Sequence, residues 1–161
     1  MKSITFCMHS YNRDEILQKT LEYNCHQLSK CEKLNGEVVL VRHGDFKTHL
    51  ISFLTRLKHK YPFLSVHRYS NDHGYHASVS KNYSHFVANG EVLLNLDVDN
   101  FINEKEIMLI QDAFGEFPDG CIFQLWNGVK RNGGFGKICY RRDQFLEIGG
   151  YDESFFPAGY Q

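Results

Sequence analysis

The chain has 161 residues, with 18 basic side chains against 19 acidic ones and a formal net charge of −1. This length is enough for one α/β domain with a buried core, and the balanced charge argues against a general nucleic-acid-binding protein, which would carry a basic surplus. Aromatic residues make up 14% of the chain, which argues against disorder. No apolar run approaches the about 20 residues of a membrane span, so we expect no transmembrane segment.

The N-terminus and the cysteines indicate a cytoplasmic protein, either free or peripheral to a membrane. The first residues lack the hydrophobic region of a secretory signal and have the pattern of a strand. The five cysteines are an odd number without Cys-x-x-Cys spacing, and Cys7, Cys121 and Cys139 lie in apolar, strand-like runs. We therefore expect buried thiols in a reducing compartment. The histidines and cysteines show no zinc-ligand spacing.

Strand-like and helical patterns alternate along the chain. Strands are predicted over residues 4–8, 37–41, 64–69 and 92–96, and amphipathic helices over residues 14–28, 46–60 and 76–89. The third helix is expected to turn Val79, Tyr83, Phe86 and Val87 inward. Regular alternation of this kind predicts an α/β fold with a parallel or mostly parallel sheet and helices on both faces.

The pattern changes in the last third of the chain. A helix is predicted over residues 104–114, strands over 121–126 and 137–141, and a short helix over 143–148 that ends at two glycines. A glycine-rich loop separates the two strands. There is no repeat or linker, so we predict a single domain over residues 1–161.

Two carboxylates, Asp97 and Asp99, directly follow the apolar strand at residues 92–96. Alternate residues of a strand point the same way, so we expect both side chains to face one spot where the strand leaves the sheet. Ligands of open α/β sheets bind beyond the carboxyl ends of the strands, and paired carboxylates suit Mg²⁺ or Mn²⁺ with a diphosphate. The alternative is a plain turn in which Asn100 precedes the next helix. The position after a buried strand favours the metal site.

Three motifs occur along the predicted strands and helices in a fixed order. The first strand runs into Ser10-Tyr11-Asn12-Arg13, the third helix contains Lys81-Asn82, and the fourth strand leads into Asn95-Leu96-Asp97-Val98-Asp99-Asn100. Near the end, Gly133-Gly134-Phe135-Gly136 is followed by a short helix and then by Gly149-Gly150-Tyr151-Asp152-Glu153. This order resembles GT-A-fold glycosyltransferases of the family-2 type, and the last segment looks like the galactosyltransferase-type C-terminal motif. The resemblance covers nearly the whole chain.

The resemblance implies a Rossmann-like GT-A sheet and a transferase, of the hexosyltransferase type, that moves a sugar from a nucleotide-sugar donor, UDP-linked by expectation, to a glycan or other hydroxyl acceptor. Asp99, assisted by Asp97, would hold a Mn²⁺ or Mg²⁺ ion at the diphosphate, and a carboxylate would deprotonate the acceptor. Residues 1–100 would form the donor half of the domain. The implied donor contacts are Tyr11, Asn12, Arg13, Asp45, His76, Lys81, Asn82, Asp97 and Trp126, with Asn100 and Trp126 beside a sugar.

Two departures from the family pattern bear on the site. The second strand runs into Arg42-His43-Gly44-Asp45, where family members carry an acidic residue that contacts the base. In the resembling enzymes the catalytic base comes after the position of Gln161, so we expect a shortened chain whose residues 101–161 are only the start of an acceptor half. Asp152 and Glu153 are the candidates for a substitute base.

Alternative interpretations exist for the residues and for the function. Tyr11-Asn12-Arg13 is also typical of a turn, Lys81-Asn82 of an exposed helix face, His76 of a helix cap, Trp126 of a core, and Asp152-Glu153 of an exposed turn. A non-catalytic module that binds nucleotide sugars fits the same motifs. A phosphohydrolase of the haloacid-dehalogenase type fits less well, because its Asp-x-Asp pair follows the first core strand.

Overall fold

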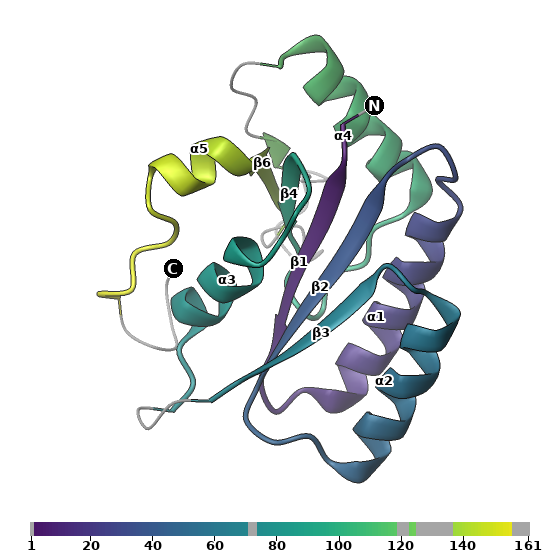
Figure 1. The fold of residues 1–161 in the computed structure, drawn as a ribbon, viewed down its shortest axis with the longest axis vertical. Helices are drawn as coiled ribbons and strands as arrows, with labels where there is room; N and C mark the ends of the chain where they lie inside the picture. The colour runs from purple at the N-terminus through teal and green to yellow at the C-terminus, as the bar shows by residue number, and fades with distance from the viewer. Residues whose placement is uncertain (1, 71–73, 119–122, 125–136, 156–161) are drawn as a thin grey trace.

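The strands that the structure describes form one six-stranded sheet in the order β3-β2-β1-β4-β6-β5 (Figure 1). This computed structural model describes residues 2–70, 74–118, 123–124 and 137–155. The parallel strands are β1 (Ile4–Ser10), β2 (Gly36–His43), β3 (Leu64–Tyr69) and β4 (Val92–Asn95). Antiparallel to β4 runs β6 (Ile138–Arg141), which pairs with β5 (Phe123–Gln124). The mostly parallel sheet predicted from the sequence is confirmed.

Helices cover both faces of the sheet (Figure 1). One face carries α1 (Asp14–Ser29), α2 (Thr48–Lys60) and α4 (Glu104–Glu116), and the other carries α3 (Ala77–Phe86) and α5 (Arg142–Glu147). Alternation along β1 explains the two layers: Phe6 belongs to the core under α1, whereas Cys7 belongs to the core that contains Phe145 of α5. No helix in the described part of the chain is long and apolar enough to cross a membrane.

The prediction of buried cysteines is confirmed for those that the structure describes. Cys7, Cys25 and Cys31 are buried thiols, Cys139 is buried as well, and Cys121 lies outside the described residues. Burial raises the pKa of Cys25 to about 12, so this thiol stays protonated at neutral pH. These cysteines pack as small apolar side chains.

Helix α3 packs on the sheet through small polar side chains rather than through an apolar stripe. Its buried residues are Ser78, Ser80, Asn82, Ser84 and His85. Phe86 is 45% exposed, so the prediction that it points inward is wrong, whereas Tyr83 and Val87 are partly buried against the core. The His85 ring stacks on Phe145, with 4.8 Å between ring centroids, and its Nδ1 lies 2.6 Å from the Lys81 carbonyl oxygen.

Burial of His85 makes the stability of the fold depend on pH. Burial lowers the pKa of His85 to about 3, whereas a histidine in the unfolded chain titrates near pH ~6.5. The stabilising effect of a neutral His85 is therefore complete above that pH and is lost as the pH falls toward 3, because only the unfolded state takes up the proton. We expect the free energy of unfolding, measured by urea denaturation, to fall between pH 7 and pH 4.

The variant His85→Phe keeps a buried ring and removes the titrating group. We expect its free energy of unfolding to fall less steeply over the same pH range than that of the wild type. Equal slopes for the two proteins would show that His85 is protonated in the folded state as readily as in the unfolded one.

Candidate functional site

The two candidate metal-binding carboxylates lie on a turn directly after β4. The strand ends at Asn95, earlier than predicted, and the amide of Asn100 donates to the carbonyl of Asp97 at 2.9 Å. We call residues 97–100 the aspartate turn. Within it Val98 and Asn100 are buried, whereas the side chains of Asp97 and Asp99 are 34% and 50% exposed. A closed turn, and not a continued strand, therefore directs both carboxylates outward.

A cleft of about 610 Å³ lies at the carboxyl ends of β1 and β4. This is the point where the strand order reverses, since β1 has β2 on one side and β4 on the other; ligands of open α/β sheets bind at such points. The cleft is lined by His9, Ser10, Tyr11, Arg13, Tyr75, Ala77, Lys81, Asp97, Val98 and Asp99. It thus brings together residues from the first strand, the third helix and the aspartate turn.

Each carboxylate of the aspartate turn faces a cation. The Nζ atom of Lys81 lies 3.5 Å from Oδ1 of Asp97, and Nη1 of Arg13 lies 3.1 Å from Oδ2 of Asp99. Lys81 is only 13% exposed and its ammonium group lies over the Tyr151 ring, 5.4 Å from the centroid. The cleft therefore holds two negative and two positive groups within reach of one another.

Two aromatic rings, those of Tyr11 and Tyr75, line the same cleft. Tyr11 stacks on Tyr75 with 4.8 Å between centroids, and His43 meets both rings edge-on. Burial lowers the pKa of His9 to about 4, so its ring is neutral at neutral pH. Sequence reasoning missed His9 and Tyr75. His9 is the last residue but one of β1 and Tyr75 comes two residues before α3, so the available signal was an aromatic residue beside the end of a predicted element.

Asn82 does not line the cleft, unlike its neighbour Lys81. Its Nδ2 donates to the Tyr151 carbonyl at 2.9 Å and to Oε1 of Glu153 at 2.7 Å, and its Oδ1 accepts from the Tyr151 amide at 2.7 Å. Gly150 has φ +86°, and a Cβ there would lie 2.5 Å from Oδ1 of Asn82. The structure therefore places Asn82 as the link between α3 and residues 151–153.

Three other predicted site residues, Asp45, His76 and Asp152, do not line the cleft. Asp45 pairs with Arg68 at 2.6 Å, and Nδ1 of His76 accepts from the Val79 amide at the start of α3. Asp152 accepts from the Ser154 amide. Trp126 lies outside the described residues.

The end of β2, where the resembling enzymes carry an acid, holds a buried ion pair. Nη2 of Arg42 lies 3.1 Å from Oδ1 of Asp14, and the two side chains are 2% and 7% exposed. The Arg42 guanidinium also donates to the carbonyls of Ser10 and His43. Arg42 thus lies beneath the first turn of α1 and does not line the cleft.

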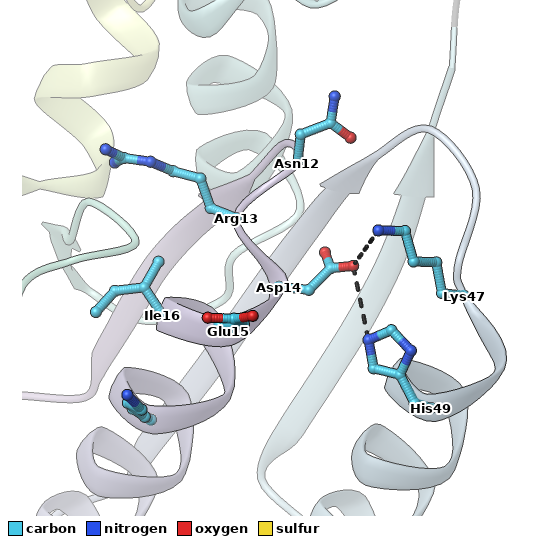
Figure 2. Close-up of a pocket in the computed structure, with 8 residues that line it drawn as sticks. Asn12, Arg13, Asp14, Glu15, Ile16, Lys47 and His49 are labelled. Carbon is cyan, nitrogen blue, oxygen red and sulfur yellow. Dashed lines mark ion pairs between the residues drawn. The ribbon is translucent and has the colours of Figure 1, made fainter.

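A second cleft, of about 540 Å³, lies over the starts of α1 and α2 (Figure 2). Its side chains include Asn12 and Arg13, and Arg13 lines both clefts. Figure 2 shows Lys47 and His49 directed at the Asp14 carboxylate, whose Oδ2 lies 3.6 Å from Lys47 and 3.9 Å from His49. The Asp14 carboxylate therefore has two cationic neighbours, the buried Arg42 and the exposed Lys47.

Removing Arg42 should destabilise the fold strongly. The variant Arg42→Met leaves Asp14 buried without its closest partner, and breaking a buried pair in this way costs about 3–5 kcal/mol. The control Lys47→Met removes a 68% exposed partner of the same carboxylate and should cost no more than about 0.5 kcal/mol. Denaturant titration of the three proteins measures both changes, and equal stabilities of the two variants would contradict the buried role of Arg42.

Comparison with known protein families gives one decisive match. The sequence matches glycosyl transferase family 2 over residues 5–156. The chain belongs to this family. Comparison of this family-2 domain with curated proteins gave no match.

Solved structures share the fold of this family-2 domain. The mannosyltransferase PcManGT from Pyrobaculum calidifontis, in complex with GDP-Man and Mn²⁺, aligns with a TM-score of 0.70 and 15% identity, over 97% of this chain and 49% of that one. S. aureus TarS 1-349 aligns with a TM-score of 0.71 and 18% identity, over 94% and 50%, respectively. TarS 1-349 in complex with UDP-GlcNAc gives 0.68 and 17%, over 91% and 47%. The expected GT-A fold is confirmed, and the family-2 domain spans about half the length of these structures.

Proposed function

We propose that this domain binds a nucleotide sugar, with UDP as the expected nucleotide, and transfers the sugar to a hydroxyl group of a glycan or similar acceptor. The observation that carries the proposal is the aspartate turn facing a cleft at the switch point of the sheet, with a cation beside each carboxylate. Membership in glycosyl transferase family 2 supports it. Solved relatives with the same fold are in complex with GDP-Man and with UDP-GlcNAc.

The donor set fits a hard divalent cation that binds together with a diphosphate. Asp97 and Asp99 offer carboxylate oxygens, which Mg²⁺ and Mn²⁺ accept. The described residues contain no group of three or more His, Cys, Asp or Glu side chains that could hold a metal ion, so diphosphate oxygens and water would supply the other ligands. When bound, the ion would neutralise charge on the leaving diphosphate.

The two cations of the cleft suit the phosphates of the same donor. Arg13 and Lys81 pair with the carboxylates at 3.1 and 3.5 Å, and each would pair with a phosphate oxygen once the carboxylates hold a metal ion. The guanidinium of Arg13 can contact a phosphate with two N–H groups at once. The Tyr11–Tyr75 stack, which lines the same cleft, suits the flat nucleobase.

Transfer also requires a base that takes the proton of the acceptor hydroxyl, and such a group contributes about 10²–10⁴-fold to the rate. Within the chain, Asp152 and Glu153 are the candidates. One oxygen of each already accepts a hydrogen bond, from the Ser154 amide and from Asn82, respectively. Donor binding does not require this base, so it can be tested apart from transfer.

Metal-dependent nucleotide binding tests the aspartate turn directly. We expect calorimetry with UDP to show tighter binding in Mn²⁺ than in EDTA for the wild type, and no such difference for Asp99→Ala. The control Asp112→Ala removes an exposed carboxylate of α4 and should behave as the wild type. Equal metal-dependent binding by Asp99→Ala would refute the role of the aspartate turn.

A second variant tests the phosphate contact. We expect Arg13→Ala to weaken UDP binding about 10-fold or more, since a hydrogen bond to a charged group contributes about 1.5–3 kcal/mol. Its melting temperature should stay near that of the wild type, because Arg13 is 57% exposed. Lys19 lines the second cleft and not the first, so the control Lys19→Ala should leave UDP binding unchanged. A lower melting temperature with unaltered UDP affinity would show that Arg13 has a structural role instead.

A further inference from the structure

Helix α1 buries a line of polar side chains that contact the backbone around the aspartate turn. Thr20, Asn24 and Gln27, which we call the α1 stripe, follow one another at the spacing of one helix face. Their exposed fractions are 0%, 0% and 8%. Polar residues on an otherwise buried helix face are costly unless they are hydrogen-bonded, so their partners show what the stripe is for.

Each member of the α1 stripe bonds to the segment that begins at the aspartate turn and ends at the start of α4. The Thr20 hydroxyl donates to the Val98 carbonyl at 2.6 Å. Asn24 donates to the Asn100 carbonyl and accepts from the Ile102 amide, both at 3.0 Å. Gln27 accepts from the Glu104 amide at 3.2 Å.

These bonds fix the backbone between and beside the two carboxylates without touching the carboxylates themselves. The Val98 carbonyl, which Thr20 holds, lies in sequence between Asp97 and Asp99. The same helix carries Arg13 at its N-terminal end, where it pairs with Asp99. One rigid helix thus sets both the direction of the aspartates and the position of the cation beside them.

We infer that the α1 stripe positions the aspartate turn for the metal and the diphosphate, an inference that rests on the proposed function. Thr20 and Asn24 are positioning residues: they touch neither donor nor metal but determine where the ligating oxygens lie. Replacing groups that orient metal ligands typically lowers metal affinity or activity about 10–100-fold. A stripe that only stabilised the fold would leave the metal-dependent part of nucleotide binding unchanged.

The test uses paired threonine variants. Thr20→Val keeps the shape of the side chain and removes the hydroxyl, and Thr20→Ser keeps the hydroxyl. The matched control is Thr5→Val, since Thr5 is equally buried and its hydroxyl bonds to Glu37 and Gly90 on the α3 side of the sheet, at the start of β1. UDP affinity is measured in Mn²⁺ and in EDTA for each protein, together with melting temperature and amide hydrogen exchange of residues 97–102.

We expect Thr20→Val to lose about 10–100-fold of its UDP affinity in Mn²⁺, with little change in EDTA and faster exchange at residues 97–102. Thr20→Ser, which keeps the hydroxyl, should retain the wild-type UDP affinity in Mn²⁺ and the wild-type exchange rates. Thr5→Val should lower the melting temperature comparably and leave the UDP affinity in Mn²⁺ unchanged. If Thr20→Val does not fold, Asn24→Ala takes its place in the same comparison.

Two results would overturn the inference while leaving the proposed function intact. One is wild-type affinity for UDP in Mn²⁺ in both Thr20→Val and Asn24→Ala. The other is an equal loss of that affinity in Thr20→Val and Thr5→Val, which would reflect general destabilisation. A wild-type chain whose UDP affinity is the same in Mn²⁺ and in EDTA would overturn the proposed function, and the inference with it.

Discussion

The parallel pairing of β1 with β4 is the interaction on which the site depends. It brings the loop after Ser10 beside the aspartate turn, although these segments are far apart in the sequence, and the amide of Leu96 extends the pairing by bonding to the Cys7 carbonyl at 3.0 Å. Because β2 lies on the other side of β1, the strand order reverses where β1 pairs with β4, and the helices that follow these two strands, α1 and α4, lie on the same face of the sheet. The cleft at the carboxyl ends of β1 and β4 is a consequence of this strand order. The side chains that line the cleft determine which ligand it can bind.

Helix α1 connects the sheet to the charged groups of the cleft. Its first turn is anchored by the buried pair of Asp14 with Arg42, and its middle holds the aspartate turn through Thr20 and Asn24. Burying a pair of charges is costly, and here the exposed Lys47 lies near the Asp14 carboxylate in addition to the buried Arg42. Arg13, which directly precedes Asp14, lines both clefts.

Hydrophobic periodicity was sufficient to predict the sheet, its helices and the carboxylates at the end of β4, because a buried strand or helix face produces a pattern among residues that are close in the sequence. The periodicity failed where the buried side chains are polar. The serines of α3 and the side chains of Asn24 and Gln27 look exposed in a pattern that counts apolar residues. The partners of Asn24 lie 76 and 78 residues away, and the partner of Arg42 lies on another element, so only the folded chain reveals them. The role of Asn82 could likewise not be predicted, because its partner Tyr151 lies 69 residues away in the sequence.

The adjacent glycines after α5 are constrained for different reasons. Gly149 has φ +80°, but a Cβ there would meet nothing within 4 Å, so asparagine, which tolerates this backbone region, is an acceptable exchange. Gly150 has a similar backbone and no free volume, because Asn82 and Phe145 fill the space where a side chain would begin. As homologous sequences diverge, the first position can therefore vary while the second is fixed for as long as Asn82 holds residues 151–153. A paired change of both Gly150 and Asn82 would mark a lineage in which that connection has been rebuilt.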